Sequence, residues 1–372
     1  MSKNRSNDAD HCATFLEQLS DIAVAFADSS ASKVDCLAEF EDYWPQIEQA
    51  QQWAARETPN DTNAAHMAHQ FASYCADSGD QLIEIYRSQA LRIDWLSDGL
   101  AAAEKLENEK EAAGVAYNLG VVLISMGRMN EAKPLIDRAM AYFETKEDKS
   151  DVIAALNVRG MIARSENDNA ESLRQHLAAY EISKDPKYES KHSSTLTFLA
   201  RAYTNVGDVT KAEECYREAL PIFKRLNNLK SFVEAIINIA RLRLNEETEE
   251  SMQEATTLCD SALAIFEDPG LPIDGQLLHH RMGALMLDIA HPLTEEFVID
   301  SLKGATTAKN LMLEGCLRQL LAFVHLKRDK LEDAFAEARL SKSAFSAISF
   351  SHGVDSADTL LAVLNERATP PA

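Results

Sequence analysis

Residues 196–220 read LTFLARAYTNVGDVTKAEECYREAL, and this stretch decides the fold. The segment from Ala116 reads AYNLGVVLISMGRMNEAKPLIDRAM, the segment from Ala155 reads ALNVRGMIARSENDNAESLRQHLAAY, and a fourth related segment starts near Ala235. Small residues recur forty positions apart in these copies, at Gly120, Gly160, Ala200 and Ala240, and again at Ala139, Ala179 and Ala219. A spacing that persists through several steps is typical of a repeat protein.

Each copy predicts one helical hairpin. It contains an apolar run with a period near 3.6, a turn such as residues 206–208, and a second amphipathic run. Small residues are needed where two helices cross closely, because a larger side chain would force the axes apart. Thr210 with Glu213, and Ser251 with Glu254, have capping-box spacing, which predicts where two of the second helices begin.

The predicted fold is therefore all-α: a right-handed superhelix of helical hairpins, or α-solenoid, preceded by an N-terminal helical extension. We expect residues 1–10 to be disordered, 11–60 to form the extension, 61–350 to form about seven hairpins, and 351–372 to form a cap helix and a loose tail. Within the extension, helices are expected over 15–27 and 34–56, joined by a loop around 29–32. Pro134 and Pro221 fall inside second helices, where local kinks are expected.

Composition excludes several classes of function. The chain has 59 acidic and 37 basic residues, a net charge of -22, so its average surface repels phosphate backbones and anionic membranes. No apolar stretch is long enough to predict a membrane span, and we expect a cytoplasmic protein without nucleic-acid or membrane partners. The six cysteines are far apart, without CxxC spacing, and are interpreted as buried hydrophobes.

The repeats resemble the forty-residue variety of tetratricopeptide repeat (TPR), with Asn118, Gly120, Gly127, Ala132 and Ala139 carrying the likeness. The resemblance implies a TPR-like solenoid. The N-terminal third, with HCATFL at 11–16, FEDYWPQI at 40–47, WAA at 53–55 and RIDWL at 92–96, resembles the region after the winged helix in bacterial NB-ARC signalling ATPases that carry TPR sensors. The sequence has no GxxxxGK[ST] motif, so we expect a sensor region without the nucleotide-binding module of that family.

No catalytic, metal or cofactor site is predicted. Adjacent histidines such as His279 and His280 point about 100° apart on a helix, and His291 does not complete a ligand set with them. His176 lies at the apolar position of its repeat, which predicts a core histidine with a hydrogen-bonded ring. No GxSxG or similar motif organises a serine nucleophile. We therefore expect a protein that is not an enzyme.

The candidate binding residues come from the resemblance to TPR superhelices, in which the first helix of each hairpin lines the concave groove. The positions expected to face a ligand are Tyr117, Asn118, Asn157, Arg164, Arg201, Asn238, Arg241 and Arg281. Arginines spaced by forty predict a positive track that selects an acidic peptide, a terminal carboxylate or a phosphate, because guanidinium binds these groups through paired hydrogen bonds. The competing interpretation is that the arginines pair with carboxylates of adjacent helices and stabilise the stack.

Two functions remain open from the sequence. The first is a protein- or peptide-binding scaffold or sensor adaptor that uses the concave groove, with a partner that carries an acidic segment. The second is a peptide-gated regulator, a TPR receptor that controls an effector protein. The partner's identity and the oligomeric state do not follow from the sequence.

Overall fold

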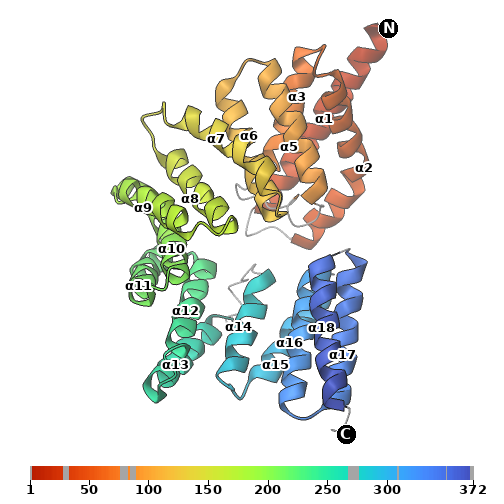
Figure 1. The fold of residues 1–372 in the computed structure, drawn as a ribbon. Helices are drawn as coiled ribbons and strands as arrows, with labels where there is room; N and C mark the ends of the chain where they lie inside the picture. Colours follow the sequence, from red (N-terminus) through yellow and green to blue (C-terminus); the bar gives the residue numbers. More distant parts are fainter. Residues whose placement is uncertain are drawn as a thin grey trace. The chain divides into compact units, whose positions relative to one another are not determined.

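The computed structural model describes residues 2–27, 33–75, 83, 89–266, 276–307, 310–348 and 350–368. Every regular element in these ranges is a helix (Figure 1). The all-α, TPR-like helical-repeat prediction is therefore confirmed. None of the described helices is both long enough and apolar enough to cross a bilayer.

The chain divides into two compact units, Met1–Lys191 and His192–Ala372. The helices of the first unit are α1 (Ser2–Ala27), α2 (Lys33–Glu57), α3 (Thr62–Ser73), α5 (Gln89–Lys105), α6 (Glu109–Ser125), α7 (Met129–Phe143), α8 (Ser150–Ser165), α9 (Asn169–Ser183) and the 3₁₀ turn η1 (Pro186–Tyr188). Neighbours along the chain pack together, as in the hairpins α6/α7 and α8/α9.

The second unit continues the pattern from α10 (Glu189–Asn205), which begins at the end of the first. It contains α11 (Val209–Arg225), α12 (Leu229–Leu244), α13 (Glu249–Phe266), α14 (Gln276–Asp288), α15 (Thr294–Thr307), α16 (Leu311–Lys327), α17 (Leu331–Ala347) and α18 (Ser351–Ala368). The last three helices lie side by side in Figure 1, with α17 packed against both of its neighbours.

The small residues of the repeat lie at the helix crossings, as predicted. Gly120 faces the second helix of its hairpin so closely that an added Cβ would lie 2.7 Å from Ile136 Cδ1. In the next hairpin, a Cβ on Gly160 would collide with the ring of His176. The recurring alanines are all fully buried: Ala132, Ala139, Ala179, Ala200, Ala212, Ala219 and Ala240. The forty-residue spacing in the sequence therefore marks the positions where the two helices of each hairpin cross.

His176 confirms the prediction of a core histidine. The residue is 3% exposed, and its ring atom Nδ1 lies 3.1 Å from the side-chain oxygen of Asn157. The cysteines are also mostly interior, since all but the half-buried Cys316 are buried and each is a free thiol.

Several turns between helices share one construction: a residue with positive φ follows one helix, and an Asp or Asn directly after it caps the next. Gly207 (φ 83°) precedes Asp208, whose side chain accepts from the backbone N–H of Lys211. Asn167 before Asp168 and Asn227 before Asn228 repeat this arrangement. Glycine and asparagine suit the first position because they adopt positive φ at little cost.

Both predicted capping boxes are wrong. Thr210 lies inside α11 because Asp208 occupies the cap, and the buried Glu213 instead accepts hydrogen bonds from Arg217 and Arg243. Helix α13 is capped three residues earlier than expected, where Thr248 and Ser251 exchange backbone-to-hydroxyl hydrogen bonds of 3.0 and 3.1 Å. Glu213 and Glu254, which the pattern predicted as cap residues, instead form ion pairs with Arg217 and Arg243.

The ends of the chain differ in part from expectation. Instead of a disordered stretch over residues 1–10, α1 begins at Ser2, because this segment contains neither glycine nor proline to interrupt a helix. The cap helix α18 spans Ser351–Ala368. The loop around 29–32 and the tail after residue 368 lie outside the described residues. Helices α7 and α11 continue through Pro134 and Pro221, and the kinks there remain a prediction.

Candidate functional site

Side chains from three helices of the second unit meet in what we call the arginine cluster: Arg201, Glu234, Asn238, Arg241 and Arg281. Arg201 comes from α10, Arg281 from α14, and the other three from α12. Glu234, Asn238 and Arg241 are spaced i, i+4 and i+7, so they share one face of α12. The polar side chains on this face of α12 contact polar side chains of α10 and α14, the first helices of the two neighbouring hairpins.

Glu234 is the anion at the centre of the cluster. Its Oε1 atom accepts a hydrogen bond from Arg201 and another from Arg281. The second guanidinium nitrogen of Arg281 donates to Oδ1 of Asn238 at 2.6 Å. Two of the three arginines spaced by forty, Arg201 and Arg281, are therefore paired between helices, as the competing structural interpretation requires.

Arg241 differs from the other two arginines. No carboxylate of the described residues lies within ion-pair distance of it, and NH2 makes only a long hydrogen bond, 3.4 Å, to the carbonyl oxygen of Arg281. Its buried Nε atom has no acceptor among the described residues, and neither has the buried Nδ2 atom of Asn238. Burial lowers the pKa of Arg241, the nearby Arg281 charge lowers it further, and Asp288 acts in the opposite direction. The cluster thus contains an under-satisfied cation and an amide donor on the same face of α12.

The arginines of the cluster also affect the pKa values of two neighbouring side chains, His280 and Tyr216. Burial lowers the pKa of His280, and the charges of Arg241 and Arg281 add to that effect, so the neutral ring is favoured. Burial raises the pKa of Tyr216, while a hydrogen bond with Arg201 and the charge of that arginine oppose the shift. A negative charge placed beside Arg241 would favour protonation of His280.

The forty-residue spacing does not explain why Arg281 joins this cluster. The loop over residues 245–251 carries three extra residues, so Gly283, and not residue 280, takes the crossing position after Ala240. An added Cβ on Gly283 would meet Leu320 and Val298, as expected at a helix crossing. Arg281 is therefore the counterpart of Asn238, the residue to which it is bonded.

The predicted residues of the first unit have different surroundings. Tyr117 is half-buried on α6, where its ring lies 6.1 Å from that of Phe143, and Asn118 beside it is also half-buried. Arg164 is exposed near the end of α8. The assignment of Asn157 to a ligand-facing surface is corrected: it is 5% exposed and turned toward His176 on α9. Since it lies three residues before Gly160, it shares the helix face that packs inside the hairpin.

Glu234 was missed from the sequence. A single glutamate in an acidic chain does not indicate a site. Its spacing of four and seven residues from Asn238 and Arg241, however, predicts that the three side chains share one helix face.

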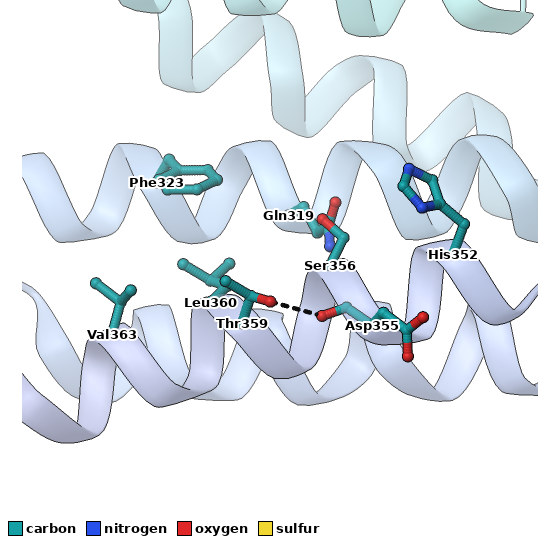
Figure 2. Close-up of a pocket in the computed structure, with 8 residues that line it drawn as sticks. All are labelled: Gln319, Phe323, His352, Asp355, Ser356, Thr359, Leu360 and Val363. Carbon is teal, nitrogen blue, oxygen red and sulfur yellow. Dashed lines mark hydrogen bonds between the residues drawn. The ribbon is translucent and has the colours of Figure 1, made fainter.

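A separate pocket of about 400 Å³ lies between α16 and α18 (Figure 2). Phe323 and Val363 form its apolar part and are 43% and 42% exposed. The Nε2 atom of Gln319 is buried and lacks an acceptor, while Thr359 donates to the carbonyl oxygen of Asp355 at 2.9 Å. These groups can hold an apolar side chain next to a hydrogen-bond acceptor.

The histidines considered for a metal site are separated. His279 lies against the rings of Phe266 and Phe297, and Nε2 of His291 lies 3.0 Å from a carboxylate oxygen of Asp260. In the part of the chain that the structure describes, no group of three or more histidine, cysteine or acidic side chains could hold a metal ion.

Comparisons with known proteins agree with the repeat architecture. Two family models described as tetratricopeptide repeat match residues 113–145 and 193–231. A comparison with curated proteins found no match.

Solved structures resemble the chain at low sequence identity. Aspartyl phosphate phosphatase F from Bacillus subtilis superposes with a TM-score of 0.57 and 11% identity, covering 90% of this chain and 94% of that one. A Rap protein complexed with competence and sporulation factor gives a TM-score of 0.51 and 14% identity, covering 96% and 98%. A tetratricopeptide repeat protein from Parabacteroides merdae gives 0.50 and 14%, covering 81% and 98%. Such likeness shows the fold alone.

Proposed function

We propose that this protein is a non-catalytic adaptor that binds a peptide or protein segment along the first helices of its hairpins. In this proposal an anionic group of the ligand binds at Arg241. The single observation that carries the proposal is the state of that side chain: a partly buried guanidinium that has no carboxylate of the described residues within ion-pair distance, and whose Nε has no acceptor among those residues. A buried donor without a partner costs free energy, and an anionic ligand would recover it.

The electrostatic setting supports the choice of ligand. Three arginines gather on α10, α12 and α14 in a chain whose net charge is -22. A local positive site within a negative surface attracts an anionic group and repels other acidic surfaces. The ligand class that fits is a segment with a side-chain carboxylate, a terminal carboxylate or a phosphate.

The purely structural interpretation accounts for only part of the cluster. It fits Arg201 and Arg281, because both are bonded to Glu234 on the helix between them. It does not fit Arg241, which joins no acidic side chain among the described residues. Structural pairing and ligand binding are therefore divided between different arginines in this proposal.

A peptide-gated regulator is the second candidate. Glu234 links α10 and α14 through α12, so a ligand anion that competes for Arg281 would alter contacts between three helices. The Rap protein among the similar structures was solved in complex with competence and sporulation factor, which is a precedent for a bound factor on this fold. Any effector would be a further protein.

The test of the proposal uses synthetic peptides that carry one acidic residue, with binding followed by fluorescence anisotropy. Arg241→Ala is expected to weaken the best peptide by about 1–3 kcal/mol, the range for a charge-assisted bond at a partly desolvated site. Binding should also weaken as salt rises. Arg174→Ala is the matched control, because Arg174 is exposed and pairs with Glu171 within its own helix. Equal affinity of Arg241→Ala and the parent protein would refute the proposal.

A further inference from the structure

The carboxylate of Glu234 occupies the position that a ligand carboxylate would take between Arg201 and Arg281. One oxygen atom accepts from both guanidinium groups, and the Asn238 side chain accepts from Arg281 on its other side. Glu234 is half-buried on α12, and its side chain is 22% exposed. The cluster therefore already contains one resident anion.

Arg241 has no such resident partner among the residues that the structure describes. It lies seven residues after Glu234 on the same helix, and the buried Nδ2 of Asn238 between them has no acceptor. Both unsatisfied donors of the cluster are thus displaced along α12, away from the carboxylate of Glu234. An anion that enters the cluster is best received at the Arg241 end.

We propose that Glu234 is a specificity-determining residue, which restricts the ligand to a single anionic group bound at Arg241 and excludes a second anionic group from the position between Arg201 and Arg281. This inference rests on the proposed function and names the class of its ligand: a segment with one carboxylate or one phosphate, flanked by uncharged residues. A second acidic residue in the segment gains no affinity at this surface.

The charge balance explains why attraction and selection can coexist. Three guanidinium groups and one carboxylate leave the cluster positive, so a first anion is still attracted. A second anion would have to approach the Glu234 carboxylate or displace it from two hydrogen bonds. Since like charges in close contact are unfavourable in a partly desolvated site, the second anion gains little. Glu234 thereby fixes where the anion binds and how many are accepted.

The substitution Glu234→Gln tests this assignment. Glutamine has nearly the same shape and keeps an oxygen that accepts from arginine, but it removes the resident charge. The probes are two sets of blocked synthetic heptapeptides, one set with a single glutamate and one with two glutamates separated by one to four residues. The measured quantity is the ratio of the dissociation constant for the best one-glutamate peptide to that for the best two-glutamate peptide, at fixed ionic strength.

In the parent protein the ratio is expected to be near one or lower, because the second glutamate finds no position. In Glu234→Gln it is expected to rise about tenfold or more, the gain from one charge-assisted bond. Glu250→Gln is the matched control, since Glu250 is an exposed glutamate of α13. An unchanged ratio in a folded Glu234→Gln protein overturns the inference.

Asn238→Asp provides a second arm with nearly unchanged side-chain volume. It adds a resident carboxylate next to Arg281 and toward Arg241, so affinity for the one-glutamate peptide should fall about tenfold, and an unchanged affinity would count against the inference. Failure of the proposed function looks different. If Arg241→Ala binds the one-glutamate peptide as the parent does, or if no peptide binds the parent, the binding surface itself is wrong and the inference is overturned with it.

Discussion

Replacing Arg241 by methionine should stabilise the second unit, although arginine pairs are usually regarded as stabilising. Methionine preserves the length and apolar stem of the side chain but removes the charge. Within the described part of the chain, this guanidinium has no carboxylate within ion-pair distance and its Nε has no acceptor, and burial lowers the pKa of the group. All three features show that folding disfavours the charge at this position.

The magnitude follows from the bonds gained and lost. The substitution gives up one long hydrogen bond, 3.4 Å, to the carbonyl oxygen of Arg281. It removes a buried unsatisfied donor, which costs about 1–3 kcal/mol. We therefore expect a net gain of about 1 kcal/mol. Arg281→Met is the contrasting variant: it breaks bonds to Glu234 and Asn238, and it should lose about 1–3 kcal/mol.

Hydrogen exchange is the appropriate assay, because two compact units need not unfold in one transition. Amides of α12 report the stability of the cluster directly. In Arg241→Met they should exchange more slowly than in the parent protein, while peptide affinity falls. If Arg241→Met instead loses as much protection as Arg281→Met, the side chain contributes to the helix stack, and its proposed role in binding is refuted.

Two other predictions concern packing and pH. Ala200→Leu should lower the free energy of unfolding by about 1–3 kcal/mol, because Ala200 is fully buried at a helix crossing. Ala178→Leu, at an exposed helical position, should change it little. Equal melting of the two variants would show that the repeat register is wrong. Affinity for an anionic peptide should increase as pH falls through 6.5. In the free protein the pKa of His280 lies below that ordinary value, and a bound anion would raise this pKa. Binding of the peptide therefore takes up a proton, which lower pH favours. His280→Asn should flatten this dependence, and a slope equal to that of the parent would exclude His280 as its source.

The fold could be predicted because hairpin packing leaves a direct mark in the sequence. A residue such as Gly120 or Ala200 must be small wherever two helices touch, and the requirement recurs once in each repeat. Helix starts were harder to predict. Thr210 has the right chemistry for a cap, but the preceding turn, with Gly207 at positive φ, already places Asp208 at that position.

The candidate site could be predicted in part. Arg201 and Arg241 follow from the forty-residue period, but Arg281 reaches the cluster through a three-residue insertion that shifts its register. Asn157 does not face a ligand because it shares the helix face of Gly160, which packs against His176 inside the hairpin. Whether an arginine has a partner depends on the rotamers of side chains from three helices, and no spacing rule contains that information.

The tight contacts at the hairpin crossings limit how this sequence can change over evolutionary time. Gly120 faces Ile136 and Gly160 faces His176, each in a space that a single extra carbon would overfill. Neither member of such a pair can be exchanged freely, because enlarging the glycine requires a smaller residue opposite, and the intermediate with only one change is penalised. We expect these pairs to covary among relatives. In chimeras, whole hairpins should transfer between repeats more successfully than single helices, since a hairpin carries both halves of its own fit.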